Sequence, residues 1–304
     1  MATSVITVTH NSGDVVAGML QSLPPDVEAI VVDNASSDGS AEIARRARPG
    51  TVVVELPNNG GFGHGCNVGA GVASGEVLVF LNPDGRVVDD ALSALAAHVQ
   101  SDPHSIFGPA FLGADGELRH DVRRRSEPYH EVLDLLPGSR RWLPDRLRRD
   151  LAHDDRRYST GGEVDYLQGA CLAIDRHLFH MLGGFDEDFF LYSEEETLCE
   201  GVRRAGGHCI YLPAAVVQHV GGTSTGRVND FAMGHFYRSR VIFYRKRYGF
   251  AGGLTAAALI ALGLIANLLC SPLVKRYGGD NPRVEWHAAA LSGLVRGSIA
   301  DLRR

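Results

Sequence analysis

Four short apolar runs, rich in β-branched residues, recur in the first third of the chain. They lie at residues 4–9 (SVITVT), 29–33 (AIVVD), 51–56 (TVVVEL) and 77–81 (VLVFL). Because the runs are nearly continuous in apolar character, we expect strands buried on both faces, as in a parallel sheet. Residues 14–23, 40–48 and 66–73 lie between them and are expected to be helices. This alternation predicts a doubly wound sheet with right-handed crossovers.

The pattern loosens after residue 105. Residues 104–120 (HSIFGPAFLGADGELRH) predict a strand, a turn and another strand, and strand character returns at residues 169–175 and 208–213. Between these segments, residues 119–157 are dense in Arg, Asp and Pro. A charged run of this kind is usually a solvated face. The alternative is a mobile loop over a site that binds anions.

One long segment, residues 250–274, carries no charge over 25 residues and has basic residues on both sides. That length could span a bilayer. Its many Ala and Gly residues and Asn267 argue instead for a packed hydrophobic helix, and interfacial membrane contact is a third interpretation. We expect a helix or helical hairpin that keeps the protein at the inner membrane face.

Bulk composition narrows the classes of function. The chain has 304 residues, 44% hydrophobic and 22% charged, which suits one large or two modest folded domains. Its net charge of −6 gives no general attraction to nucleic acid. Five scattered cysteines without a CxxC pair argue against a zinc or redox motif and favour a reducing compartment. The first residues enter a strand pattern directly, so no signal peptide is expected.

Polar residues follow three of the predicted strands. Asp33 closes the second strand, residues 59–67 (NGGFGHGCN) follow the third, and residues 82–85 (NPDG) follow the fourth. Open α/β sheets bind ligands at the carboxyl ends of their strands, so these residues are candidates for one site. Asp33 could accept hydrogen bonds from a ribose or a base. The glycine spacing matches neither GxGxxG nor the P-loop, and Asn-Pro-Asp-Gly is also good turn chemistry.

A second polar group lies between residues 183 and 219. Six carboxylates fall within residues 186–196, among them three adjacent glutamates. If these glutamates are close and partly buried, like-charge repulsion would raise their proton affinity, which would suit a general base near neutral pH. The alternative is an acidic helix N-terminus, where carboxylates favour the helix dipole, and both can hold at once. A lone histidine such as His219 is more often structural. With Asp84, however, it could bind one divalent cation, since these ligands suit Mn²⁺ or Mg²⁺.

The order of these blocks resembles that of the family 2 glycosyltransferases of the GT-A type. The matching blocks, within residues 5–227, are VVDNASSDGS, NNGGFGHGCNVG, FLNPD, GGFDEDFFLYSEEE and YLPAAVVQHVGGTST. The chain is most similar to the bacterial rhamnosyltransferase-like subgroup, which builds cell-envelope glycans. The resemblance implies a GT-A, Rossmann-like doubly wound mixed α/β sheet over residues 1–227. Residues 228–304 would then form a C-terminal helical extension.

The resemblance also implies roles for individual residues. Those that would bind the nucleotide are Thr9, Asn11, Asp33, Asn59, Gly61, Phe62 and Asn82. Asp84 stands where the family's DxD motif stands, so it would bind Mg²⁺ or Mn²⁺ on the donor diphosphate, with His219 near the metal. Asn82 replaces the first Asp of that motif.

Glu195 takes the position of the family's catalytic base. Consecutive residues of a helix point about 100° apart, so only one of three adjacent glutamates can face the site squarely. We therefore expect Glu194 to support the helix start or to bind polar neighbours, and Glu196 to point away from the site, for example to solvent.

Two positions depart from the subgroup's pattern. Thr197 and Gly201 stand where the subgroup usually has Asp and Arg, which bears on contacts to the acceptor or the diphosphate. Glu196 and either Arg203 or Arg204 are candidates to compensate.

The predicted function is metal-dependent, inverting transfer of a sugar to a hydroxyl of a cell-envelope glycan or lipid-linked acceptor. The resemblance favours dTDP-rhamnose as donor, with a UDP-sugar as the alternative. A non-catalytic nucleotide-sugar-binding protein with a decayed site is the main rival. A nucleotidyltransferase would need a basic glycine-rich loop after the first strand, which THNSGDVV lacks. We expect no nucleic-acid partner and a cytoplasmic location at the inner face of the membrane. The sequence leaves open whether the protein forms a homodimer.

Overall fold

The computed structural model describes residues 2–119, 122–136, 139–151, 155–219 and 230–276. The chain divides into two compact units. The first comprises Met1–Arg123, Ala152–Phe190 and Glu194–Arg227. The second comprises Arg124–Leu151, Leu191–Ser193 and Val228–Arg304. Two segments that precede residue 227 thus belong with the C-terminal helix. The longer of them, Arg124–Leu151, contains a helix that packs on the C-terminal helix.

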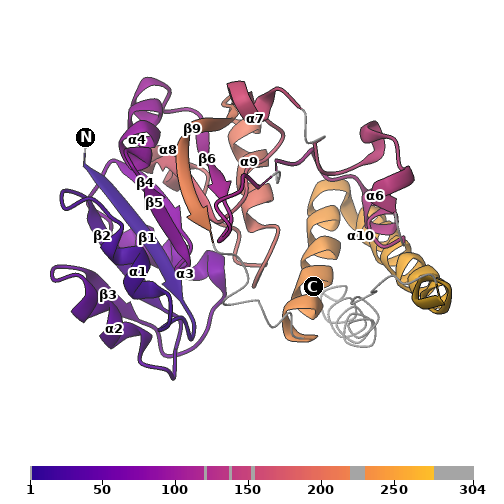
Figure 1. Cartoon of the computed structure of the whole chain (residues 1–304), viewed down its shortest axis with the longest axis horizontal. Helices are drawn as coiled ribbons and strands as arrows, with labels where there is room; N and C mark the ends of the chain where they lie inside the picture. The colour runs from indigo at the N-terminus through magenta and orange to yellow at the C-terminus, as the bar shows by residue number, and fades with distance from the viewer. Residues whose placement is uncertain (1, 120–121, 137–138, 152–154, 220–229, 277–304) are drawn as a thin grey trace. The chain divides into compact units, whose positions relative to one another are not determined.

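Nine strands of the described chain form one mixed sheet in the first unit (Figure 1). They are β1 (Thr3–Thr9), β2 (Glu28–Asp33), β3 (Val52–Glu55), β4 (Val77–Leu81), β5 (Gly85–Val88), β6 (Ile106–Leu112), β7 (Gly162–Glu163), β8 (Cys171–Asp175) and β9 (Cys209–His219). Their order is β3-β2-β1-β4-β8-β6-β9-β5, and β7 pairs with β9. Strands β1, β2, β3 and β4 run parallel to one another. Strand β8 is antiparallel to its neighbours β4 and β6. The predicted mixed α/β sheet is confirmed.

The helices alternate with the strands along the first part of the chain. The helical segments are α1 (Val16–Gln21), α2 (Ser40–Ala47), α3 (Phe62–Val72), α4 (Ala91–Ser101), α5 (Pro128–Leu133), α6 (Ser139–Trp142), η1 (Asp145–Leu147), α7 (Arg157–Thr160), α8 (Arg176–Met181), α9 (Glu194–Arg204) and α10 (Asp230–Arg276). The three predicted helices correspond to α1, α2 and α3. Helix α3 begins earlier than predicted, at Phe62, so the glycine-rich loop before it is short. The four-residue strand β5 and helix α4 were not predicted.

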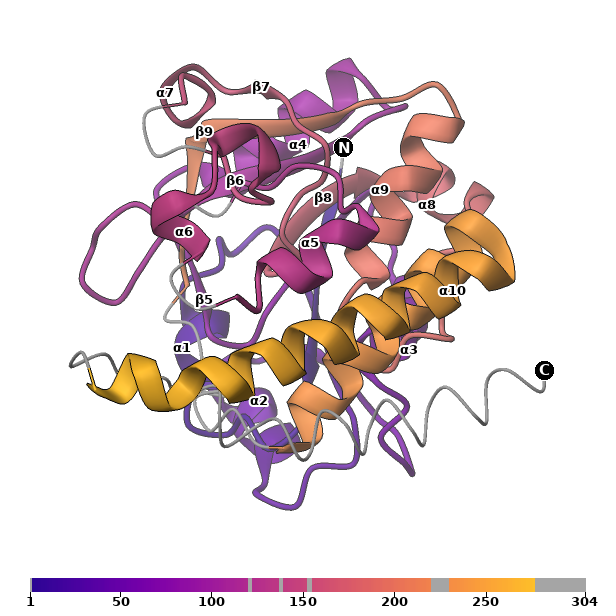
Figure 2. The same ribbon diagram turned by 90° about the vertical axis from the view of Figure 1, so that its right-hand side faces the viewer.

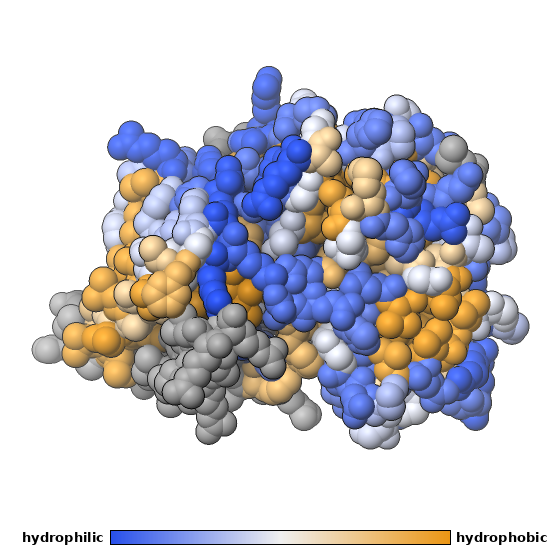
Figure 3. All heavy atoms as spheres, turned by 180° about the vertical axis from the view of Figure 1, so that it is seen from behind, coloured by the Kyte–Doolittle hydropathy of each residue, from blue (hydrophilic) through white to orange (hydrophobic). Residues whose placement is uncertain are grey.

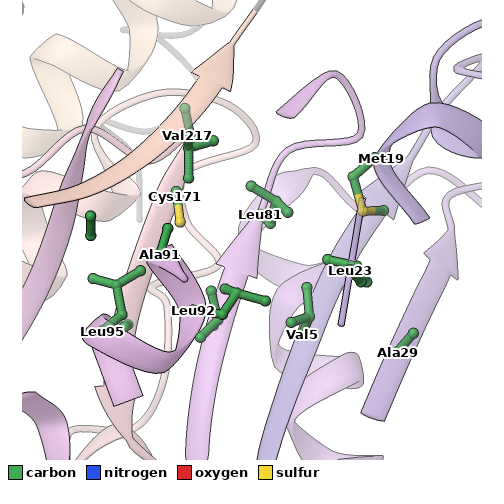
Figure 4. Close-up of a cluster of buried hydrophobic side chains, with 14 of the residues drawn as sticks. Val5, Met19, Leu23, Ala29, Leu81, Ala91, Leu92, Leu95, Cys171 and Val217 are labelled. Atoms are coloured by element: carbon green, nitrogen blue, oxygen red, sulfur yellow. The ribbon is translucent and has the colours of Figure 1, made fainter. Parts of the chain in front are cut away.

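The sheet of the first unit is covered on both faces, which explains its apolar strands. Val79 of β4 belongs to a cluster with residues of α1 and α4, and Figure 4 shows Met19 and Leu92 reaching into this cluster. The next residue, Phe80, points the other way, and its ring lies 4.9 Å from that of Phe179 on α8. Alternate residues of a strand point to opposite faces, so both must be apolar here.

The second unit is built on α10, which is kinked. Gly249 has a φ of 71°, outside the helical range, and divides α10 into two helical segments. The helix predicted for residues 250–274 is confirmed as the second of them. Helix α5 packs beside α10, as Figure 2 shows. The Asn267 amide donates a 2.7 Å hydrogen bond to the carbonyl of Leu135, a residue that also packs with Ile260 and Leu264.

The charged segment at residues 119–157 is partly buried, contrary to the expectation of a solvated face. Arg149 is 6% exposed, and its guanidinium lies 2.6 Å from the Glu131 carboxylate, which Arg240 of α10 also contacts at 2.9 Å. Burial alone would raise the pKa of Glu131, but the two arginines and a Tyr244 hydrogen bond bring that pKa down to about 2. These charges connect α5 and α10 within the second unit.

Candidate active site

The carboxyl ends of β1 and β2 bring the predicted nucleoside-binding residues together. Thr9 and Asp33 are paired across the two strands, and the Thr9 hydroxyl donates to Asp33 Oδ1 at 2.8 Å. The Ser36 N–H donates to Asp33 Oδ2 at 3.0 Å, and the Ser37 N–H donates to the Asn11 side-chain oxygen at 2.8 Å. The loop after β2 therefore folds over both strand ends and orients the Asp33 carboxylate and the Asn11 amide.

The glycine-rich loop is tied to this region on one side and to the acidic segment on the other. The Gly61 N–H donates to Asn59 Oδ1 at 2.9 Å, and the Asn34 amide donates to the Gly61 carbonyl at 2.8 Å. The Phe62 N–H donates to the Phe190 carbonyl at 3.0 Å. Gly61 has a φ of +93°, and a Cβ there would overlap the Phe190 backbone, so this position requires glycine. Asn34 was not predicted, although it directly follows Asp33.

The Phe62 side chain belongs to an aromatic cluster. Its ring lies 6.0 Å from that of Phe185, in an edge-on arrangement. The Phe185 ring in turn lies 4.9 Å from Phe80 and 5.5 Å from Phe179. This cluster fixes the first turn of α3 against β4 and against the segment that leads to α9.

Asp84 and His219 meet because β5 pairs with β9. The pairing sets Gly85 opposite His219, and His219 Nε2 lies 3.2 Å from Asp84 Oδ1. The Gly85 N–H donates to the Asn82 carbonyl at 3.0 Å, so residues 82–85 also form the predicted turn. The turn interpretation of the NPDG sequence is confirmed, whereas the role of Asp84 in ligand binding stays a prediction. The Phe111 ring packs 5.8 Å from the His219 ring and supports it.

This pair suits a cation that a substrate completes. The described part of the chain holds no group of three or more His, Cys, Asp or Glu side chains arranged as a metal site. Mg²⁺ and Mn²⁺ at nucleotide sites use one or two protein ligands together with phosphate oxygens. One carboxylate and one imidazole fit that role, whereas a closed protein cage would need more ligands.

The three glutamates at the start of α9 have different environments. Glu194 and Glu196 are each 3% exposed, whereas Glu195 is partly exposed. The expectation that Glu196 points to solvent is wrong. Helix α9 is buried around much of its circumference, as its other buried residues show, and Glu196 falls within that buried part.

Glu195 lies against the backbone that precedes β8. A methyl group added to Gly169 would lie 3.4–3.5 Å from Cβ, Cγ and Cδ of Glu195. The neighbouring Ala170 carbonyl accepts a 2.9 Å hydrogen bond from the Asn82 N–H. The pairing of β4 with β8 therefore brings Glu195 to the strand end that carries Asn82 and Asp84. Gly169 was not predicted; its only signal was a glycine directly before an apolar run.

One carboxylate of the acidic stretch has a structural role. The Asn67 amide donates to Glu187 Oε1 and to the Phe185 carbonyl, both at 2.8 Å, and His64 Nδ1 lies 2.9 Å from Glu187 Oε2. The Asn67 hydrogen bond, with a smaller effect from His64, holds the pKa of Glu187 below its usual value. Glu187 thus anchors the acidic stretch to α3.

Comparison with known proteins identifies the family to which this chain belongs. The sequence profile of "Glycosyl transferase family 2" matches residues 4–182, more than half of the chain. The chain belongs to glycosyl transferase family 2. The predicted resemblance is confirmed.

Two relatives of this family 2 glycosyltransferase carry a rhamnosyltransferase name. The N-acetylglucosaminyl-diphospho-decaprenol L-rhamnosyltransferase of Mycobacterium tuberculosis is 27% identical over 266 residues, covering 80% of this chain and 84% of the relative. The rhamnosyltransferase WbbL of Escherichia coli is 24% identical over 224 residues, covering 69% of this chain and 80% of the relative. The similarity to bacterial rhamnosyltransferases thus extends over most of the chain.

A solved structure of the same fold confirms the GT-A architecture. The mannosyltransferase PcManGT from Pyrobaculum calidifontis, in complex with GDP-Man and Mn²⁺, gives a TM-score of 0.57 at 17% identity. The match covers 99% of this chain and 86% of that chain.

Arg203 and Arg204, the candidates to compensate for the two family residues that this chain lacks, make contacts with other residues of the chain. Arg203 Nη1 lies 3.4 Å from Cys209 Sγ, and Arg204 Nη2 lies 3.1 Å from Glu200 Oε2. Both belong to the last turn of α9, about 12–14 Å along its axis from Glu195 at 1.5 Å per residue. Neither is placed to serve the Glu195 end of the helix. The VGGTST part of the last family block, residues 220–225, lies outside the described residues.

Proposed function

We propose that this family 2 glycosyltransferase is a metal-dependent, inverting enzyme that transfers rhamnose from dTDP-rhamnose to a hydroxyl of a lipid-linked cell-envelope glycan. A UDP-sugar is the alternative donor. The observation that carries the proposal is the contact of Glu195 with Gly169. It brings a partly exposed carboxylate to the strand end that holds Asp84. The name of the mycobacterial relative, which includes a diphospho-decaprenol acceptor, supports the acceptor class.

The donor would lie along the carboxyl ends of β1, β2 and β4. Asp33, held by Thr9 and Ser36, would accept hydrogen bonds from the nucleoside, with Asn11 beside it. Asp84 and His219 would hold Mg²⁺ or Mn²⁺ at the diphosphate. When bound, the cation would neutralise charge that develops on the leaving diphosphate. The remaining predicted donor contacts are Asn59, Gly61, Phe62 and Asn82.

Glu195 would act as the general base. Its carboxylate takes the proton of the acceptor hydroxyl while the hydroxyl oxygen forms a bond to the anomeric carbon. The bond from that carbon to the diphosphate oxygen breaks on the opposite face. A single displacement of this kind inverts the anomeric configuration, as in inverting glycoside hydrolases, with a hydroxyl in place of water.

The second segment of α10 supports a location at the inner membrane face. By length and composition, α10 is the one helix among the described residues that could cross a membrane. One of its faces is buried in the second unit, through Ala256, Ile260 and Leu264. The opposite face exposes large apolar side chains at Leu254, Leu262, Ile265, Leu268 and Leu269. Apolar side chains are visible over this unit at the left of Figure 3. A helix with one packed and one exposed apolar face fits an interfacial position.

Not every basic residue near this helix is available to lipid head groups. Arg247 is 4% exposed at its side chain and pairs with Glu127 at 3.0 Å, whereas Lys246 is exposed. The apolar face would therefore supply most of the membrane affinity, with a smaller contribution from exposed basic groups.

The proposal is tested with a panel of dTDP-rhamnose, UDP-N-acetylglucosamine and GDP-mannose, each with Mn²⁺ or Mg²⁺ and a synthetic polyprenyl-diphospho-N-acetylglucosamine. We expect metal-dependent transfer with one donor. Glu195→Gln should lower the transfer rate by about 10²–10⁴-fold while keeping the metal-dependent thermal shift with nucleoside diphosphate, because the amide cannot take the proton. Asp84→Asn should lose that thermal shift.

Glu187→Gln is the matched control, since it changes another carboxylate of the same stretch, one that contacts Asn67 of α3. We expect its transfer rate to stay within a few-fold of wild type. Metal-dependent donor binding without hydrolysis or transfer of any donor would favour the non-catalytic alternative instead.

A further inference from the structure

A three-residue piece of the chain, Leu191–Ser193, directly precedes the helix that carries the proposed base. It belongs to the second unit although the residues on both sides of it belong to the first. Helix α9 begins directly after it, at Glu194. Tyr192 and Ser193 have φ values of 70° and 73°, in the left-handed region that few residues other than glycine adopt. Such a conformation costs free energy and persists only where surrounding contacts impose it.

Those contacts come from one face of α10. The Ser239 hydroxyl donates to the Leu191 carbonyl at 2.8 Å, and Arg240 Nη1 donates to Ser193 Oγ at 3.2 Å. The Tyr192 ring lies 5.5 Å from that of Phe236 in an edge-on arrangement. Positions 236, 239 and 240 lie on one helical face, so a single surface of α10 contacts all three residues of the segment.

Arg240 is itself rigidly held. It is 2% exposed, its Nε donates to Glu131 at 2.9 Å and its Nη2 donates to the Tyr244 hydroxyl at 2.8 Å. Arg149, which follows η1 in the chain, contacts the same carboxylate at 2.6 Å. The guanidinium that reaches Ser193 is therefore fixed in a buried ionic network before the reaction begins.

We propose that Ser239 and Arg240 are positioning residues for sugar transfer. They hold Leu191–Ser193 in its left-handed conformation, and this conformation sets the direction in which α9 starts and where its second residue, Glu195, is presented. The inference rests on the proposed function of Glu195 as the base. Ser239 and Arg240 act through the peptide chain and do not touch the reacting atoms.

The test uses two small changes that leave the ionic network in place. Ser193→Ala removes the oxygen that Arg240 contacts, and Ser239→Ala removes the donor to Leu191. We expect each to lower kcat for transfer from dTDP-rhamnose by about 10–100-fold, because a displacement of about 1 Å can cost that much. The KM for dTDP-rhamnose and the thermal shift produced by dTDP with Mn²⁺ should stay unchanged. Tyr248→Phe removes a 2.7 Å hydrogen bond from another residue of α10 to Glu127, outside the Glu131 network, and should keep wild-type kcat.

A double-variant cycle separates positioning from general stabilisation. In a Glu195→Gln background, Ser193→Ala and Ser239→Ala should lower the residual rate no further, since they act only through the base. Wild-type kcat in both single variants, or the same loss with and without Glu195, would overturn the inference. A wild-type rate in Glu195→Gln itself would overturn the proposed function instead, so the two failures are distinguishable.

Discussion

At the scale of single residues, the environment of Glu195 separates it from its two neighbours. Glu194 and Glu196 are buried, whereas Glu195 is partly exposed and lies against Gly169. Identical side chains thus receive different environments from the rotation of about 100° between consecutive helix positions. The role of Glu195 as the base stays a prediction, and its contact with Gly169 offers a way to probe it without altering the carboxylate.

Gly169 provides a graded test at this scale. A Cβ there would meet Glu195 at an ordinary contact distance of 3.4–3.5 Å, so Gly169→Ala should transfer sugar within a few-fold of wild type. Gly169→Val adds two methyl groups that must displace the Glu195 side chain, and we expect kcat to fall by about 10–100-fold. Steady-state kinetics with thermal unfolding as a fold control measure both. Equal rates for the Ala and Val variants would show that the contact does not position Glu195.

At the scale of elements, helix α5 shows how the second unit stabilises itself with buried ionisable groups. The Glu127 N–H donates to His130 Nδ1 at 2.9 Å within a capping box at the start of the helix. His130 is 2% exposed, and its Nε2 has no hydrogen-bond partner among the residues that the structure describes. Burial, followed by the nearby Arg149, lowers the pKa of His130 to about 4. The folded second unit therefore holds this histidine neutral.

This arrangement predicts loss of stability in mild acid. The folded pKa of His130 lies below its unfolded value of 6.5, so the unfolded chain binds more protons between pH 6.5 and about 4. The contribution of His130 is complete above pH 6.5 and is lost as the pH falls toward 4. Glu131 adds a second loss between pH 4.5 and about 2. We expect the thermal midpoint to fall steadily below pH 6.5.

The matched comparison is His130→Gln against His98→Gln, because His98 is an exposed histidine on α4. Between pH 6.5 and 4.5 the His130 variant should show a flatter dependence of the midpoint on pH, and the His98 variant should follow wild type. Parallel curves for all three proteins would contradict the assignment of this transition to His130.

At the scale of the whole molecule, the two units differ in how they use apolar residues. The first unit buries them on both faces of a sheet, whereas the second exposes a row of them along the last part of α10. Large exposed apolar patches mark sites of interaction with membranes or other proteins. The proposed partner of this row is the membrane surface, because the row lies on a helix that could also cross a bilayer by length and composition.

Membrane binding is therefore expected to depend on the exposed face of α10. Leu262→Gln with Ile265→Gln should weaken flotation with phosphatidylethanolamine–phosphatidylglycerol vesicles by about 10-fold or more, since each buried apolar side chain contributes about 1.5–3 kcal/mol. Val72→Gln with Met181→Gln changes two exposed apolar residues of the first unit and serves as control. Unchanged binding of the α10 variant, or equal loss in both variants, would refute the interfacial position.

The sequence by itself determined the alternation of strands and helices. It also determined which strand ends carry the candidate site residues. Continuous apolar runs predicted burial on both faces, and the residues after those runs predicted where Asp33 and Asp84 would lie. The uncharged stretch at residues 250–274 predicted a helix. Each of these predictions needs only the local spacing of side chains, because that spacing is set by the geometry of the strand or helix itself.

Only the tertiary structure decided which distant residues meet. The short strand β5 pairs with β9 and so brings Asp84 to His219. No local sequence pattern predicted that strand. Arg149 and Glu196 have charged side chains that local rules assign to solvent, yet both are buried. Whether a charge can be buried depends on partners elsewhere in the chain, as the Glu131 network shows. Local spacing carries no information about those partners, because they are brought together only when the elements pack.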